Sequence, residues 1–100
     1  MKALLSEQPG GPDTLRLAEV PDPVAGTGEL LIRVRACAIN FPDVLIIEDN
    51  YQLKPPRPFA PGGEIAGEVE AVGEGVAGWS PGDRLIAVPG FGGQIGRAHV

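Results

Sequence analysis

Short runs of alternating apolar and polar residues, separated by glycine- and proline-rich turns, make up most of the chain. In the longest run, apolar residues occupy every second position from Leu30 to Ala38, and Arg33 and Arg35 lie between them. This period of two is typical of a half-buried strand. The same criteria predict strands at residues 2–5, 15–20, 29–39, 65–72 and 84–88. Short strands with frequent turns, among them a predicted type II turn at residues 80–83, favour a mainly β fold, a small closed or partly open barrel.

One segment breaks the strand pattern and predicts a helix over about residues 41–48. Asn40 is a good helix cap, because its side-chain oxygen can accept the N–H of Asp43. Pro42 suits the first turn, where its missing N–H costs nothing, and the charge of Asp43 favours the positive end of the helix dipole. Capping is therefore the first interpretation of Asn40 and Asp43. It does not exclude a site, since helix N-termini also present free donors to ligands.

Composition narrows the class of protein. The chain has 100 residues with 15 glycines and 11 prolines, which suits one small, turn-rich β domain rather than a helical bundle. A net charge of −5, with no cluster of Lys or Arg, argues against a nucleic-acid partner or an anionic membrane surface. A single cysteine fits a reducing compartment, and no apolar run is long enough to span a bilayer. We expect a soluble, cytoplasmic protein.

Three apparent motifs carry no chemistry. "GEGVAG", residues 73–78, has the G-x-G-x-x-G spacing of a dinucleotide-binding motif. In such a motif a helix begins at the glycines, and here Trp79-Ser80-Pro81-Gly82 prevents one. Cys37 and His99 are the only soft metal ligands, too few for a zinc site. No Ser or Cys has a credible His partner for nucleophilic catalysis. The residues by themselves indicate a small β-rich domain without a complete active site.

Three blocks of the sequence do resemble a known family. "GGPDTLRLAEVPDPVAGTGELLIRVRACAINFPDV", "APGGEIAGEVEAVGEGV" and "WSPGDRLIAV" follow one another as in the N-terminal, chaperonin-10-like (GroES-like) domain of medium-chain dehydrogenases/reductases. The resemblance covers about residues 1–93 and is closest to the zinc-independent quinone oxidoreductase branch. In the zinc-dependent branch a Cys stands near Asn40 and a His precedes the Glu of "PGGE". Here those places hold Asn40 and Gly63, so the resemblance implies no metal.

The resemblance also implies an activity. Relatives transfer a hydride from NADPH to a quinone or enone, in a cleft between this domain and a Rossmann domain, and the full-length parent would be a homodimer. Asn40 and Phe41 would lie beside the nicotinamide and its ribose, Asp43 would brace the segment, and Tyr51 would line the substrate pocket. Glu64 would be a buried polar anchor near the same wall. Without metal, developing negative charge must meet hydrogen-bond donors, which an Asn amide and a Tyr hydroxyl can supply.

Two departures from the family pattern shape this interpretation. Many relatives carry R-x-G-x-Y where this chain has Ile47-Glu48-Asp49-Asn50-Tyr51, and loss of that Arg leaves the substrate class open. The 100 residues also end before any nucleotide-binding domain, so the fragment alone is expected to be inactive. The alternative is a non-enzymatic chaperonin-10-like module that binds a partner through its 50–60 loop. The proline content of that loop suggests a stiff wall rather than a mobile anchor.

The last residues lead to a separate prediction. After "GFGG" the family would continue with an aromatic-led strand, but this chain continues as "QIGRAHV", residues 94–100. "IGRAHV" is what one frame of a common sequencing adapter encodes (ATC GGA AGA GCA CAC GTC), and the preceding AG of the adapter would complete the codon of Gln94. We therefore expect 94–100 to be a non-native tail, with residues 95–100 encoded by the adapter. Resequencing the source DNA tests this, and different nucleotides at these codons would refute it.

Overall fold

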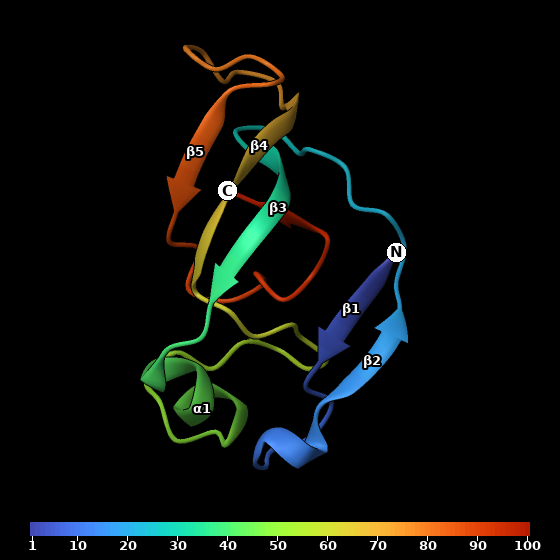
Figure 1. Ribbon diagram of the computed structural model, residues 1–100, viewed down its shortest axis with the longest axis vertical. Coiled ribbons are helices and arrows are strands. Elements are labelled where there is room, and N and C mark those ends of the chain that lie inside the picture. Colours follow the sequence, from blue (N-terminus) through green and yellow to red (C-terminus); the bar gives the residue numbers. More distant parts are fainter.

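Two antiparallel β-sheets and one short helix form the fold. The computed structural model describes all residues, 1–100. The smaller sheet pairs β1 (Lys2–Leu5) with β2 (Arg16–Glu19), and a single 3₁₀ turn, η1 (Pro12–Thr14), lies between them in sequence. In Figure 1 this pair lies at the right, beside the larger sheet. The sheets do not close on each other, which confirms the mainly β, partly open architecture.

The larger sheet has the strand order β5-β4-β3-β6. Its strands are β3 (Leu30–Ala38), β4 (Glu64–Val72), β5 (Arg84–Ala87) and β6 (Arg97–His99). All five predicted strands are present, each within one residue of its predicted ends. The strand β6 and the turn η1 were not predicted. The predicted type II turn is also confirmed, since Gly82 has a positive φ of 95° and the Asp83 N–H donates to the Ser80 oxygen at 3.1 Å.

The main core lies on one face of the larger sheet. Ile32, Ile65 and Val69 are almost completely buried and pack with Leu30, Ala87 and Ala98. Arg33 and Arg35 are exposed, as their alternation with apolar residues predicted. The alternation was wrong for Ala36, which is exposed. The pairing of β3 with β4 shifts register between Val34 and Ala36, so the strict period of two ends there.

The helix α1 (Phe41–Ile47) follows β3 directly and lies at the lower end of the molecule in Figure 1. Its residues Ile46 and Ile47 form a second buried cluster with Phe59, and the side chains of Leu15, Tyr51 and Phe91 pack against that cluster. Neither α1 nor any other helix is both long and apolar enough to cross a membrane. The rejected "GEGVAG" motif lies in a loop, with Gly75 at a positive φ of 84°.

A charged cluster joins the three strands β3, β4 and β6. The Glu70 carboxylate accepts a hydrogen bond from Arg97 Nε at 2.6 Å and another from Arg33 Nη2 at 2.8 Å. These hydrogen bonds, first that of Arg97 and then that of Arg33, lower the pKa of the Glu70 carboxyl. Arg97 belongs to the segment expected to be non-native. That hypothesis concerns the origin of the codons and stays a prediction.

The lowered pKa of Glu70 predicts a pH dependence of stability. The stabilisation from this group is fully present above the ordinary glutamate pKa of about 4.3, and it is lost as the pH falls through the lower folded value. Urea denaturation from neutral pH into this acidic window should therefore show a steeper loss of unfolding free energy for the wild type than for Glu70→Gln. Glu74→Gln, on an exposed side chain without an ion pair, is the control and should follow the wild type. Parallel curves for the wild type and Glu70→Gln would contradict the prediction.

Candidate functional site

The start of α1 is built as the sequence predicted. Asn40 is the N-cap, with extended backbone, and forms a capping box with Asp43. The Asn40 N–H donates to Asp43 Oδ2 at 2.9 Å, and the Asp43 N–H lies 3.0 Å from the main-chain oxygen of Asn40. Asp43 is 8% exposed, so its carboxylate is held inside the structure. The position of Asn40 as the helix cap is confirmed, although the Asp43 N–H donates to the main-chain oxygen of Asn40 and not to its side chain as predicted. The bond from the Asn40 N–H to the Asp43 carboxylate fixes the backbone that carries the Asn40 side chain.

One cleft brings together the polar residues that the sequence analysis selected. Its volume is about 420 Å³, and Asn40, Asp43, Tyr51 and Glu64 all line it. The remaining lining residues come from α1, from the loop after it and from one end of the larger sheet, before β4 and after β5: Pro42, Ile46, Leu53, Gly63, Val88 and Gly90. Four polar residues therefore share one cavity, and two of them, Asn40 and Tyr51, carry neutral side chains that can donate hydrogen bonds.

Two selected residues lie differently from the expectation. Glu64 was expected to be a buried anchor, and this is wrong for these 100 residues: its side chain lines the cleft but is exposed. It is the first residue of β4, at the open rim of the sheet. Phe41 does not line the cleft and is 72% exposed. The suggested contact between Phe41 and a cofactor stays a prediction.

Cys37 lies near the site and is half-buried. Burial, followed by the nearby charge of Asp43, raises the pKa of its thiol. A methyl group added at Gly62 or at Gly93 would come 2.7 Å from the Cys37 sulfur, so both glycines leave room for the thiol. A half-buried thiol with a raised pKa is a poor nucleophile. No three His, Cys, Asp or Glu side chains are grouped so that they could hold a metal ion.

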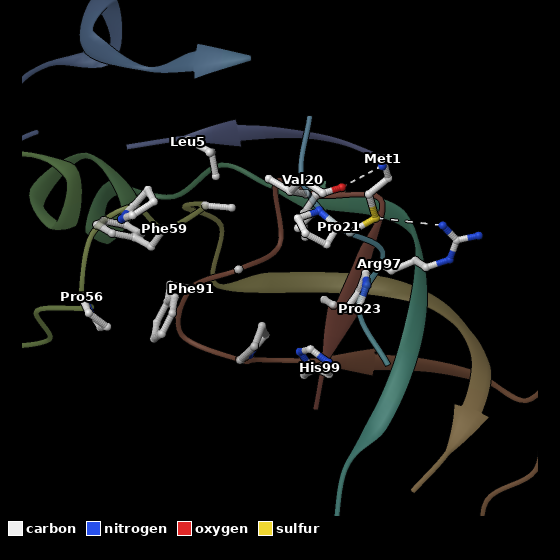
Figure 2. Close-up of a pocket in the computed structure, with 16 residues that line it drawn as sticks. Met1, Leu5, Val20, Pro21, Pro23, Pro56, Phe59, Phe91, Arg97 and His99 are labelled. Carbon is white, nitrogen blue, oxygen red and sulfur yellow. Dashed lines mark hydrogen bonds between the residues drawn. The ribbon is translucent and has the colours of Figure 1, made fainter. Parts of the chain in front are cut away.

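A second cavity, of about 500 Å³, lies between β1 and the larger sheet, and sequence reasoning missed it. Figure 2 shows its lining, in which prolines far apart in the sequence, among them Pro21 and Pro56, accompany Phe59 and Phe91. The polar groups of this cavity are already engaged. Arg97 bonds Glu70, and His99 Nε2 lies 2.7 Å from the Val24 oxygen. The cleft beside Asn40 is therefore the better candidate for chemistry.

Comparisons with known proteins agree with these observations. The family "Alcohol dehydrogenase GroES-like domain" matches residues 26–98. "Synaptic vesicle membrane protein VAT-1 homolog-like" of Mus musculus is 41% identical over 87 residues, covering 87% of this chain and 21% of the relative. "Quinone oxidoreductase" of Lama guanicoe is 39% identical over 87 residues, covering 86% of this chain and 26% of the relative.

A solved structure extends the likeness to the fold. The quinone oxidoreductase from Thermus thermophilus, solved also in complex with NADPH, matches with a TM-score of 0.81 and 36% identity. The match covers all of this chain and 30% of that one. The chain thus spans about a fifth to a quarter of the length of the curated relatives described above.

The capping box leads to a stability prediction. Asp43→Ala should lower the free energy of unfolding by about 1 kcal/mol, because it removes the acceptor of the Asn40 N–H. Asp43→Asn retains an acceptor oxygen and should lose less. The control is Asp13→Ala, which truncates an exposed aspartate outside any side-chain hydrogen bond. Urea denaturation followed by circular dichroism gives the three values. An equal loss in Asp43→Ala and Asp13→Ala would refute a capping role for the buried carboxylate.

Proposed function

Because the chain belongs to the alcohol dehydrogenase GroES-like domain family, we propose that its residues 1–93 are the N-terminal catalytic domain of an NADPH-dependent quinone or enone reductase. The convergence of Asn40, Asp43 and Tyr51 on one cleft is the observation that carries the proposal. We propose further that residues 94–100 are a non-native tail. The full-length parent would contain a Rossmann domain and would be a cytoplasmic homodimer.

The residues around the cleft fit a nicotinamide. The cleft is within the size range of small-molecule sites, roughly 300–1,000 Å³, and its lining combines apolar and polar side chains. Asn40 lines it, and the exposed ring of Phe41 follows directly in sequence, so the two would contact the nicotinamide and its ribose. Bound NADPH would supply the hydride. The apolar side chains of Ile39, Phe41 and Val88 are 79%, 72% and 77% exposed, a surface that the Rossmann domain would cover.

The residues of this chain would stabilise the charge that develops on the substrate. Reduction of a quinone or an enone places negative charge on an oxygen atom. In the proposed site the Asn40 amide and the Tyr51 hydroxyl would donate hydrogen bonds to that oxygen. Asp43 would act indirectly, because its carboxylate holds the Asn40 backbone. The side chain of Tyr51 is half-buried, and it both packs against the Ile46–Ile47–Phe59 cluster and lines the cleft.

The residues at the positions of the zinc ligands support a mechanism without zinc. Asn40 and Gly63 occupy the two positions at which zinc-dependent relatives carry Cys and His, and neither offers a zinc ligand of the usual kind. We therefore propose that charge stabilisation comes from hydrogen-bond donors alone. Elemental analysis of the purified protein should give zinc far below one equivalent, and stoichiometric zinc would contradict this part of the proposal.

The alternative of a partner-binding module depends on a mobile 50–60 loop. Lys54 Nζ donates to the main-chain oxygen of Asp49 at 2.9 Å and to its carboxylate at 3.1 Å, which ties the loop back on itself. Arg57 bonds the end of α1. These contacts favour a fixed wall over a mobile anchor, and they support the reductase in preference to the module.

The Asn40 amide provides the test of the proposed reaction. In the full-length gene product, Asn40→Ser should lower kcat/KM for small quinones by about 10-fold or more, because it replaces an amide donor aimed at the substrate oxygen while retaining a good cap. Asn50→Ser makes the same chemical change outside the cleft and should leave kcat/KM unchanged. NADPH oxidation is followed at the absorbance band of the cofactor. Equal activity of Asn40→Ser and the wild type would show that Asn40 acts only as a helix cap.

The 100-residue chain by itself serves as a further control. Positioning of the reacting groups can supply roughly 7–11 kcal/mol of barrier reduction, and much of that positioning would come from the Rossmann domain. The chain should therefore show no turnover above the background reaction of NADPH with the quinone. Failure of the full-length protein to oxidise NADPH with any quinone or enone would refute the proposed function.

A further inference from the structure

Arg57 is a half-buried arginine without a carboxylate partner. No ion pair of the structure involves it. Its guanidinium instead donates to two neutral oxygens, the hydroxyl of Ser6 and the main-chain oxygen of Ile47 at 3.2 Å. It also lies over the ring of Phe59, 5.1 Å from the centroid. Burying part of a cation against three uncharged partners costs desolvation free energy. This suggests that Arg57 has a specific role.

Two of the three partners of Arg57, Ile47 and Phe59, belong to the buried cluster against which Tyr51 packs. Ile47 is the last residue of α1, and together with Ile46 and Phe59 it forms the buried cluster against which Tyr51 packs. Ser6 is fully buried just after β1, and its backbone exchanges two hydrogen bonds with Phe59, at 2.7 and 3.2 Å. Arg57 therefore connects β1 and α1 at the position of the cluster that supports Tyr51.

The loop that carries Tyr51 is closed by two cationic side chains. Lys54 donates a hydrogen bond to the main-chain oxygen of Asp49, and Arg57 donates one to the main-chain oxygen of Ile47. Tyr51 lies inside both closures. The Ile47 oxygen has no partner within α1. It accepts the Gly10 N–H at 3.0 Å as well as the Arg57 guanidinium, at a helix end where a positive charge is favoured. The planar guanidinium can reach the Ile47 and Ser6 oxygens at once, whereas a lysine ammonium lacks this forked geometry.

We propose that Arg57 is a positioning residue that sets the place of Tyr51 in the wall of the cleft. It acts through Ile47 and Phe59, without itself lining the cleft. The effect of Arg57 on substrate placement rests on the proposed reductase function. The effect of Arg57 on the position of Tyr51 is independent of that function and can be measured without cofactor or substrate.

The composition of the chain makes this effect directly observable. Tyr51 is the only tyrosine, so labelling with 3-fluorotyrosine gives a single ¹⁹F resonance that reports this side chain alone. In the full 100-residue chain, Arg57→Gln should move the resonance toward the position found in urea, while circular dichroism still shows a folded protein. Arg16→Gln removes an arginine that pairs with Glu7 on the surface, and it should leave the resonance in place.

Each outcome of the ¹⁹F experiment decides the proposal. A wild-type resonance in folded Arg57→Gln would overturn it. If Arg57→Gln fails to fold, Arg57→Met decides in its place, because methionine keeps an apolar side chain over Phe59 but donates to neither oxygen. A displaced resonance in folded Arg57→Met supports the proposal, and an unmoved resonance overturns it.

Kinetics separate positioning from general stability. In the full-length gene product at a temperature where both proteins are folded, Arg57→Gln should lower kcat/KM for the quinone by up to about 100-fold, with the KM for NADPH unchanged. An equal rise of both KM values would indicate a general loss of structure and would overturn the positioning role. Absence of quinone-dependent activity in the wild type refutes the proposed function, and the ¹⁹F result still decides the effect of Arg57 on Tyr51.

Discussion

The antiparallel pairing of β3 with β4 is the constraint on which the candidate site depends. Its register sets Ala38 opposite Glu64 at one end of the ladder. Asn40 follows the end of β3, and Gly63 precedes the start of β4, so the ladder brings both residues to the same rim of the sheet. Ile32 and Ile65, one on each strand, are almost completely buried and stabilise this pairing from the core face. A slip of one residue would turn the apolar side chains outward and separate the site residues.

At the start of α1, the side chain that holds the backbone and the side chain that faces the cleft belong to different residues. The buried Asp43 carboxylate binds the Asn40 backbone, and the Asn40 side chain lies at the edge of the cleft. The loop that contains Tyr51 is organised in the same way. Arg57 and Lys54 make the structural hydrogen bonds, and Tyr51 lines the cleft. In both segments a charged side chain holds the backbone while a neutral donor is available to a ligand.

Some of this arrangement could be predicted because it depends on local geometry. The period of two over residues 30–38 predicted β3, and Asn40, Pro42 and Asp43 predicted the start of α1, since capping involves only residues within one helical turn. The positive φ of Gly82 follows from its place in the Ser-Pro-Gly-Asp turn. The register shift after Val34 could not be predicted, because a bulge depends on both strands of a pair.

The sequence by itself determined five of the six strands, the helix with its cap and, through the resemblance of its blocks to a family, the candidate residues of the site. Only the tertiary structure decided which of them meet: Asn40 and Tyr51 share a cleft, Phe41 does not line it, and Glu64 is exposed at its rim. The contacts of Arg57 with Ser6 and Ile47 also had no local signature. The physical reason is that such contacts join segments distant in sequence, so they exist only once both sheets and α1 are packed together.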